Sequence, residues 1–421
     1  MYIRGCYLSD KNTIRCSFCG KGANSVSKLI TGPSVHICNE CVEMCNTILK
    51  DDRSRIPDGL SLNTLPTPKE MKDYLDQYVI SQDSVKIGVC VAAYNHYKRL
   101  LSREPHLKDD VEIEKSNMLL VGPSGTGKTL IANSLARMLK VPFTIVDATI
   151  YTEAGYVGED VENMLVRLLQ SADYDVSKAE KGIIYIDEFD KITRKSANAS
   201  ITRDVSGEGV QQAMLKILEG TVASIPPKGG RKHPEQNLIH INTRDILFIC
   251  GGAFIGLENI IEKRIGENRM GFTAGINKRR KESIGEKLKK AEPDDLINFG
   301  LIPELVGRIP GIFGLDELNE DDLLRILIEP KNSLINQYKK LFSIEGVRIS
   351  FEKEALQEVV KIAIKKKTGA RGLRNVVESA LVPIMFEIPS RKDISEILIT
   401  KDVINKKTEP IYTLKKIKKS A

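Results

Sequence analysis

Apolar and polar positions in the middle of the chain follow two alternating patterns. Short runs of consecutive apolar, β-branched residues are typical of strands buried on both faces of a parallel sheet. Between these runs, apolar residues recur on one face of amphipathic helices, as Ile131, Leu135 and Leu139 do. The pattern therefore predicts an α/β domain, a parallel sheet with helices on both faces, with its clearest strands at residues 118–121, 143–147, 183–187 and 246–250.

The pattern changes on both sides of this domain. At its start, Thr67-Pro68-Lys69-Glu70 combines an N-cap, a first-turn proline and an N3 carboxylate, which together predict a helix. Beyond the domain the chain is mainly helical in pattern, with a short strand near Val347–Phe351. The N-terminal segment carries too little apolar material to fold well without a metal. We therefore expect a small module at 1–50, a linker at 51–66, the large domain at 67–320, a smaller, mainly helical domain at 321–405 and a basic tail at 406–421.

Two long irregular insertions interrupt the large domain. One runs from about Lys195 to Gly209, and the other covers Ile225–Pro234. Irregular segments of this length inside a compact domain are usually functional or disordered. A helix around Val210–Leu218 is expected between them.

Composition changes this picture little. A chain of 421 residues predicts two or three domains, and 41% hydrophobic with 28% charged residues is ordinary for a soluble globular protein. The net charge of +7 is mild, and the C-terminal lysines indicate a solvated tail, with a nucleic-acid tail as the less favoured alternative. No apolar run approaches the ~18 residues of a membrane helix, and no signal-peptide pattern is present at the N-terminus. We therefore expect a cytoplasmic protein with no membrane partner.

The first candidate site is the pattern G-x-x-x-x-G-K-[ST], which follows the apolar run 118–121 directly. Backbone amides of such a loop converge on phosphate oxygens, Lys128 reaches the β- and γ-phosphates, and Thr129 holds Mg²⁺. The alternative, an ordinary glycine-rich turn with a surface lysine, is disfavoured by the strand and helix on either side. The predicted ATP-contacting residues are Gly122, Pro123, Ser124, Gly125, Thr126, Gly127, Lys128, Thr129 and Leu130.

A second motif predicts that the nucleotide is hydrolysed. The buried strand 183–187 ends in Asp187 and is followed by Glu188. At the carboxyl end of the strand Asp187 would bind Mg²⁺ through water, and Glu188 would polarise the attacking water. The alternative is an exposed Asp-Glu pair that opens a loop.

Four of the eight cysteines have the spacing of a zinc site. Two C-x-x-C pairs place thiolates on two tight turns, which together close a tetrahedral, purely structural shell. Buried free thiols or disulfides are the alternatives, and His36 could replace one ligand, although a surface or core histidine is favoured. The predicted zinc ligands of the module 1–50 are Cys16, Cys19, Cys38 and Cys41, whereas Cys6, Cys45, Cys90 and Cys250 are expected to be small buried hydrophobes or free thiols.

In order and spacing, these motifs resemble the ClpX family of AAA+ unfoldases, which feed the ClpP peptidase, over nearly the whole chain. The resemblance implies a homohexamer in which Arg308 reaches the neighbouring subunit's nucleotide and Arg371 contacts the γ-phosphate from the small domain. It also implies that Val79 and Ile80 flank the adenine base. From its position alone, Arg308 could equally form a salt bridge at a helix end.

The same resemblance assigns the loops that would handle substrate. Tyr156 and Val157 match the main pore loop, and Thr202–Gly209 matches the second. Arg231, Lys232 and His233 match a basic loop at the pore entrance, suited to an incoming carboxylate. Taken alone, these strings are a tight turn with a packed tyrosine and a solvated basic loop.

Two departures from the family are visible. The loop that docks on ClpP in the family carries Met270-Gly271-Phe272 here, in place of an Ile/Leu-Gly-Phe tripeptide. This difference puts the affinity for ClpP in doubt. The run 246–250 ends in Gly251-Gly252, without the polar sensor that many AAA+ ATPases carry after this strand. Arg308 and Arg371 are therefore expected to carry more of the sensing.

We expect an ATP-dependent unfoldase and translocase that uses ATP, Mg²⁺ and Zn²⁺ and delivers tagged or adaptor-bound proteins to ClpP. No peptidase constellation is found in the sequence, so degradation needs the partner. A DNA-remodelling AAA+ motor with a nucleic-acid-binding zinc module is the alternative, but aromatics are only 5% and no nucleic acid is expected. A non-catalytic zinc interaction protein is disfavoured because the candidate catalytic residues are all intact, namely Lys128, Asp187, Glu188, Arg308 and Arg371.

Overall fold

The computed structural model describes residues 15–32, 35–45, 64–102, 111, 113–152, 158–193, 207–227, 238–267, 282–366 and 369–415. The chain divides into two compact units, Met1–Ser61 and Leu62–Ala421. Within the described ranges, no helix combines the length and the apolar content needed to cross a bilayer.

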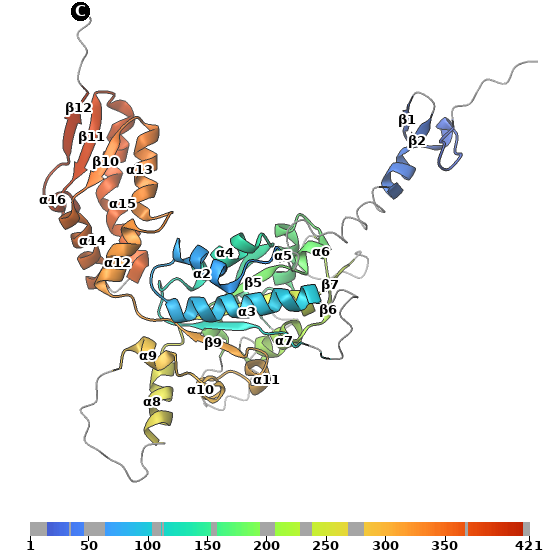
Figure 1. Ribbon diagram of the computed structural model, residues 1–421, viewed down its shortest axis with the longest axis horizontal. Coiled ribbons are helices and arrows are strands. Elements are labelled where there is room, and N and C mark those ends of the chain that lie inside the picture. Colours follow the sequence, from blue (N-terminus) through green and yellow to red (C-terminus); the bar gives the residue numbers. More distant parts are fainter. Residues whose placement is uncertain are drawn as a thin grey trace, which may run out of the picture. The chain divides into compact units, whose positions relative to one another are not determined.

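The first unit is a small module around a hairpin (Figure 1). Strand β1 (Leu29–Thr31) pairs antiparallel with β2 (His36–Cys38), after the short helix η1 (Ala23–Ser25), and residues 39–45 are helical. Among its described residues, the buried apolar cluster consists of cysteine side chains, with Val26, Leu29 and Ile37 only partly buried against them. A core this small gives the module little hydrophobic stabilisation of its own.

The second unit contains a five-stranded parallel sheet in the described part of the chain, which confirms the predicted α/β fold. Its order is β4-β5-β8-β3-β9. The predicted strands are present, but β9 had no apolar run to reveal it, because two of its four residues are glycine. The strands are β3 (Met118–Val121), β4 (Phe143–Asp147), β5 (Ile183–Asp187), β8 (Leu247–Gly252) and β9 (Gly311–Gly314).

Helices cover both faces of this sheet (Figure 1). The connection from β3 to β4 crosses to one edge, and the connections from β4 to β5 and from β5 to β8 return in the opposite direction. Because parallel crossovers are right-handed, helices of outgoing and returning connections lie on opposite faces. Ile184, Ile186 and Phe248 pack with the helices of the returning connections.

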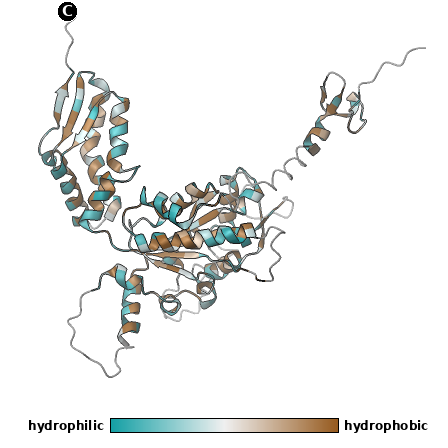
Figure 2. Ribbon diagram, in the orientation of Figure 1, coloured by the Kyte–Doolittle hydropathy of each residue, from teal (hydrophilic) through white to brown (hydrophobic). Residues whose placement is uncertain are grey.

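The helices of this domain begin with α2, whose predicted capping box between Thr67 and Glu70 is present. Figure 2 shows hydrophobic residues along the middle of α3, which packs against β9. The helices are α2 (Pro68–Asp76), α3 (Asp83–Ser102), α4 (Lys128–Leu139), α5 (Asn163–Ser171), α6 (Val176–Ala179), α7 (Glu208–Glu219), α8 (Leu257–Glu267), α9 (Ile284–Leu288), α10 (Pro293–Phe299) and α11 (Pro303–Val306). Short 3₁₀ helices are η2 (Ala148–Ile150), η3 (Phe189–Ile192) and η4 (Thr243–Asp245), and a separate hairpin joins β6 (Val222–Ile225) to β7 (Ile239–Asn242).

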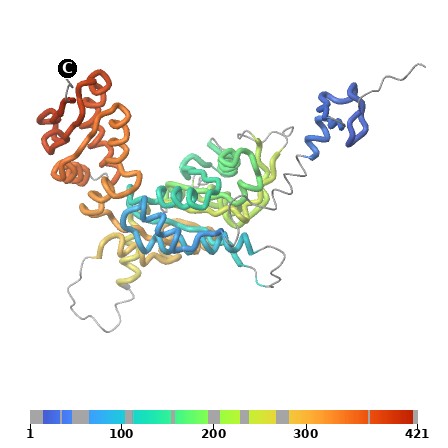
Figure 3. Tube along the Cα trace, turned by 45° about the horizontal axis from the view of Figure 1, so that its top comes forward, coloured from blue at the N-terminus to red at the C-terminus, as the bar shows by residue number. Residues whose placement is uncertain are grey.

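The C-terminal part, orange to red in Figure 3, has a second apolar core and is mostly helical, as predicted. Its sheet has the order β10-β11-β12, with β10 and β11 parallel and β12 antiparallel to β11. The pattern predicts a basic tail over 406–421, but β12 lies within it and pairs with β11, because four residues with little charge suffice for an edge strand. The elements are α12 (Glu320–Ile328), α13 (Leu334–Ile344), β10 (Arg348–Phe351), α14 (Lys353–Lys365), α15 (Gly369–Glu387), η5 (Ile388–Ser390), β11 (Ile394–Ile399), α16 (Lys401–Ile404) and β12 (Ile411–Leu414).

Candidate functional site

The glycine-rich loop lies between the C-terminal end of β3 and the N-terminus of α4. Gly125 and Gly127 have φ values of +83° and +101°, a left-handed conformation that favours glycine. Gly122 is packed so closely that a Cβ would lie 2.8 Å from the Cβ of Leu315. The loop therefore directs the chain into the first turn of α4, where free backbone amides and the helix dipole favour an anion.

Lys128 is not the surface lysine of the alternative interpretation. Its side chain is buried, and its Nζ donates to the carbonyl oxygens of Gly122 at 2.6 Å and Pro123 at 2.9 Å. Burial lowers the pKa of Lys128, and the nearby carboxylates of Asp187 and Asp190 oppose that shift. The ammonium group is thus held inside the loop, where a phosphate oxygen can replace the two carbonyls.

Oxygen donors suited to Mg²⁺ meet beside this loop. The hydroxyl of Thr129 donates to Asp187 Oδ2 at 3.4 Å, and the amide of Glu188 donates to Asp187 Oδ1 at 3.0 Å. Hydroxyl, carboxylate and water oxygens are the ligands that Mg²⁺ prefers, so Thr129 and Asp187 fit this ion. Glu188 follows in the left-handed conformation, with φ 54° and ψ 33°.

The small domain completes the phosphate pocket. A Cβ placed on Gly125 would lie 3.3 Å from the amide nitrogen of Ala370, so the N-terminus of α15 packs against the glycine-rich loop. The cavity at the glycine-rich loop has a volume of about 620 Å³. Arg374 and Asn375 also line it and were missed from the sequence, although they lie three and four positions after Arg371, on the same face of a helix. The lining residues are Ser124, Gly125, Gly127, Lys128, Thr129, Leu130, Asp187, Glu188, Gly252, Ala253, Ala370, Arg371, Arg374 and Asn375.

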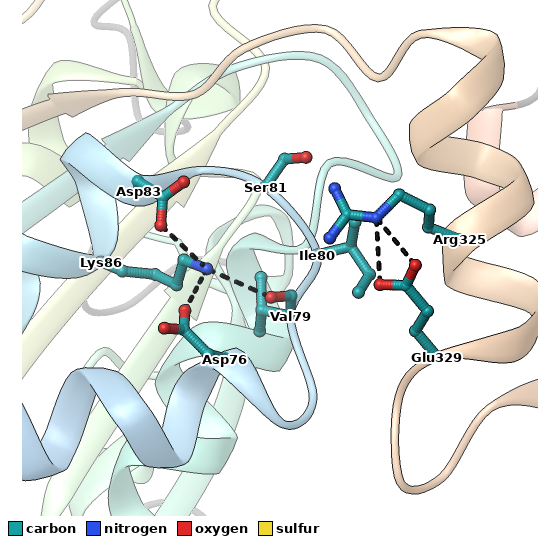
Figure 4. A pocket seen from close by; sticks show the side chains of 8 residues that line it. All are labelled: Asp76, Val79, Ile80, Ser81, Asp83, Lys86, Arg325 and Glu329. Carbon is teal, nitrogen blue, oxygen red and sulfur yellow. Dashed lines mark hydrogen bonds and ion pairs between the residues drawn. The ribbon is translucent and has the colours of Figure 1, made fainter.

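A second cavity, of about 440 Å³, includes the two residues expected to flank the adenine base. Val79 and Ile80 lie on the loop between α2 and α3, and Ile80 lies beside Arg325 of the small domain (Figure 4). A Cβ on Gly127 would lie 3.8 Å from Cγ1 of Val79, so the two cavities adjoin at that point. The remaining lining residues are Asp76, Ser81, Asp83, Lys86 and Glu329.

Arg308 lies away from this pocket. Its carbonyl accepts a hydrogen bond from Asn117 Nδ2 at 2.8 Å, and Asn117 precedes β3 at the end opposite the glycine-rich loop. Its guanidinium forms an ion pair with Glu219 at 2.9 Å, with about half of the side chain exposed (51%). Within a single chain, Arg308 therefore makes the salt bridge of the alternative interpretation and does not line the phosphate pocket.

The four cysteines form one compact cluster in the first unit. Their sulfurs all lie within 4.8 Å of one another, with Cys16 and Cys41 3.9 Å apart and Cys19 and Cys38 3.6 Å apart. Tetrahedral zinc with Zn–S bonds of ~2.3 Å requires sulfur separations of roughly 3.8 Å, so the cluster fits Zn²⁺. This four-thiol cluster does not include His36, and Cys90 and Cys250 are buried free thiols, as expected.

The thiols of the cluster also show why a cation suits it. Burial opposes ionisation of Cys16, but the amides of Cys19, Cys38 and Phe18 outweigh it and lower its pKa to about 6. Burial and then the neighbouring sulfurs raise the pKa of Cys41 strongly. Cys41 therefore resists ionisation beside the other sulfurs, and a bound Zn²⁺ would remove that resistance.

Several predicted residues lie outside the described part of the chain. They are Tyr156 and Val157 of the main pore loop, residues 202–206 of the second, Arg231, Lys232 and His233 of the basic loop, and Met270, Gly271 and Phe272 of the docking loop, together with Cys6. Gly158 is described, and an isolated β-bridge pairs Tyr151 with Glu159, on either side of the segment that contains Tyr156 and Val157.

Comparison with known protein families gives three matches. Residues 14–51 match the ClpX C4-type zinc finger, and residues 113–312 match the AAA domain (Cdc48 subfamily). Residues 318–401 match the C-terminal, D2-small domain, of ClpB protein. The matches follow one another in the order of the cysteine cluster, the parallel sheet and the mainly helical domain.

Proposed function

We propose that this chain, whose three matched domains fit a ClpX-type AAA+ unfoldase, couples ATP hydrolysis to the unfolding and translocation of proteins. The matches support a Clp-type AAA+ ATPase with ATP and Zn²⁺ sites. Beyond this we propose a homohexameric ring that uses Mg²⁺ and delivers tagged or adaptor-bound substrates to the ClpP peptidase. Four free thiols in one cluster favour a reducing compartment such as the cytoplasm.

The observation that carries the proposal is a phosphate pocket made by two domains. Lys128 and Asp187 come from the large domain, and Arg371 comes from the small domain. A guanidinium that binds the terminal phosphate stabilises the contact between the domains. This stabilisation is lost when the phosphate is lost. Hydrolysis would therefore change the preferred angle between the two domains, which is the mechanical step that an unfoldase needs.

The residues of the pocket divide the chemistry among them. Glu188 accepts the proton of the attacking water, while Lys128 and Arg371 neutralise charge that develops on the transferred phosphoryl group. Thr129 and Asp187 would hold Mg²⁺, which would supply further charge neutralisation. The loop with Val79 and Ile80 holds the adenine base of the nucleotide in the adjoining cavity.

The position of Arg308 supports the proposal that the chain assembles into a ring. The four residues of β3 separate it from the glycine-rich loop by about 13 Å, at ~3.3 Å per residue. A finger so placed cannot serve its own chain's phosphate, but its half-exposed guanidinium is available to a neighbouring subunit. We propose that Arg308 leaves Glu219 and binds the neighbour's nucleotide when the ring is formed.

The substrate assignment rests on the sequence of the loops. Tyr156 and Val157 would grip polypeptide without reading its side chains, and Arg231, Lys232 and His233 would attract an acidic tag or chain end. Met270, Gly271 and Phe272 would dock on ClpP, with methionine as an adaptable apolar contact.

The experiment that tests this function is ATP-dependent loss of fluorescence from a tagged, folded reporter protein, with and without ClpP. Irreversible loss of fluorescence is expected only with ClpP present, and Tyr156→Ala should abolish it while ATPase activity remains. Salt-dependent binding of DNA, with no effect on the reporter, would favour the DNA-remodelling motor instead. Absence of ATPase activity would reject both motors.

A further inference from the structure

Tyr185 is a fully buried tyrosine whose hydroxyl contacts Asp187, one of the residues that line the phosphate pocket. It belongs to β5, two residues before Asp187, and its ring has no exposed surface. Its hydroxyl lies 3.4 Å from Asp187 Oδ1. Residues two apart on a strand point to the same face, which is how a core side chain here reaches a pocket carboxylate.

The C-terminal end of β8 has a glycine where this hydroxyl lies. A Cβ placed on Gly251 would lie 2.0 Å from the hydroxyl oxygen of Tyr185 and 2.7 Å from Cζ of its ring. No side chain fits at residue 251 while Tyr185 keeps this position. The missing polar sensor after β8 therefore has a physical cause, since the space for such a side chain is filled by a hydroxyl from the neighbouring strand.

Asp187 receives hydrogen bonds on both carboxylate oxygens. Oδ1 accepts from Tyr185 and from the amide of Glu188, and Oδ2 accepts from Thr129. The hydroxyl of Tyr185 is the donor in its bond to Asp187, since an ionised carboxylate oxygen can only accept. The bonds from Tyr185 and Thr129 are long at 3.4 Å, and such bonds often tighten only when substrate is bound.

We propose that Tyr185 is a positioning residue that orients Asp187 toward Mg²⁺, and that it supplies from β5 the polar group that β8 lacks. This inference deepens the proposed ATP site and rests on it. Groups that hydrogen-bond to a metal ligand fix its orientation, and their loss typically lowers metal affinity by about 10–100-fold. Because the bond to Asp187 is long, we expect the lower end of this range.

Tyr185→Phe in the full-length chain isolates the hydroxyl. We expect about tenfold weaker Mn²⁺ binding to the nucleotide-loaded protein, measured by electron paramagnetic resonance. The affinity for a fluorescent ATP analogue in excess chelator should not change. The matched control is Tyr97→Phe, which removes another fully buried hydroxyl, one that donates to the carbonyl of Lys181 at 3.1 Å, far from the pocket. It should leave Mn²⁺ binding unchanged.

Gly251→Ala provides a second, independent perturbation. The added Cβ must displace the hydroxyl, so we expect the same loss of Mn²⁺ affinity, with little further loss when Tyr185→Phe is added. Unchanged Mn²⁺ binding in Tyr185→Phe, or an equal loss of nucleotide affinity with and without metal, would overturn the inference. Failure of the unmodified chain to bind the ATP analogue would instead reject the proposed function.

Discussion

Glu188 occupies a backbone conformation that costs a non-glycine residue about 1–3 kcal/mol. Neighbouring bonds hold it there. Its carbonyl accepts from the amide of Lys191 at 2.9 Å, and the buried carboxylate of Asp190 accepts from the amide of Ala253 at 3.0 Å. Strain of this kind persists only where the surroundings enforce it, so the backbone that carries the proposed general base is held in this conformation by its neighbours.

The change Glu188→Gln tests that role. The amide has nearly the shape of the carboxylate but accepts no proton, so we expect kcat for ATP hydrolysis to fall by about 10²–10⁴. Binding of a fluorescent ATP analogue should stay close to that of the unmodified chain. A phosphate-release assay together with equilibrium binding checks both, and near-normal turnover would remove Glu188 from the mechanism.

Arg308 and Glu219 form a pair in which only one partner is proposed to act on nucleotide. If Arg308 is a finger, Arg308→Ala should lower kcat of the assembled ring by about 10³–10⁵. Glu219→Ala breaks the same half-exposed ion pair, which contributes at most about 1 kcal/mol of stability, and should leave turnover nearly unchanged. Equal effects of the two changes on ATPase rate would reduce Arg308 to a structural residue.

Among the elements, the loop between α2 and α3 links the second cavity, which is lined by Val79 and Ile80, to the small domain. Ser81 and Gln82 both have positive φ, at 56° and 63°. The buried side chain of Gln82 donates to the carbonyl of Asp316 at 2.8 Å and accepts from its amide at 2.9 Å, as a backbone strand would. Because Asp316 lies between β9 and α12, the loop that we propose to flank the adenine base is tied to the connector between the two domains.

Loss of this link should weaken both stability and nucleotide binding. Gln82→Ala leaves two backbone groups of Asp316 without their partner, which costs about 1–3 kcal/mol in free energy of unfolding. We also expect weaker binding of ATP, because the loop with Val79 and Ile80 loses its anchor. Denaturant unfolding and a binding titration measure the two effects.

Gln77→Ala is the matched control on the same loop. Gln77 bonds to the small domain through its main-chain carbonyl, which accepts from the amide of Lys331 at 2.9 Å. Removal of its side chain keeps that bond, so stability and ATP affinity should change little. If both glutamine variants behave alike, the side chain of Gln82 has no special part in the coupling.

The sequence predicts elements well where one segment carries its own signal. Buried runs such as Ile183–Asp187 mark strands because no surface position interrupts them. The glycine-rich β9 and the short edge strand β12 carry no such run and depend on pairing with neighbours.

The site shows the same division between local and distant signals. Lys128, Thr129, Asp187 and Glu188 were predicted because a contiguous motif contains them, and the structure brings them together in one cavity. The contact of Gln82 with Asp316 and that of Tyr185 with Gly251 could not be predicted, because the two partners in each contact are distant in sequence.

At the scale of the whole molecule, the two units differ in what stabilises them. The second unit has extensive apolar cores in both of its domains. The described core of the first unit consists of cysteines that also form the metal cluster. Binding of Zn²⁺ contributes about 10–16 kcal/mol in small zinc modules, so here the metal is expected to take the place of a hydrophobic core.

Removal of one zinc ligand should therefore unfold the first unit alone. Cys41→Ser is expected to release zinc, detected with a chromogenic chelator, and to abolish amide-exchange protection of residues 15–45. The basal ATPase rate should stay within about twofold, because the phosphate pocket belongs to the other unit and metal binding is coupled to folding of its own module.

The control is Cys45→Ser, four residues further along the same helical segment and outside the four-thiol cluster. A serine there keeps all four ligands, so zinc content, protection and ATPase rate should all be retained. If Cys41→Ser abolished ATP hydrolysis together with zinc binding while Cys45→Ser did not, the second unit would depend on the first. The zinc module would then be part of the motor and not an independent unit.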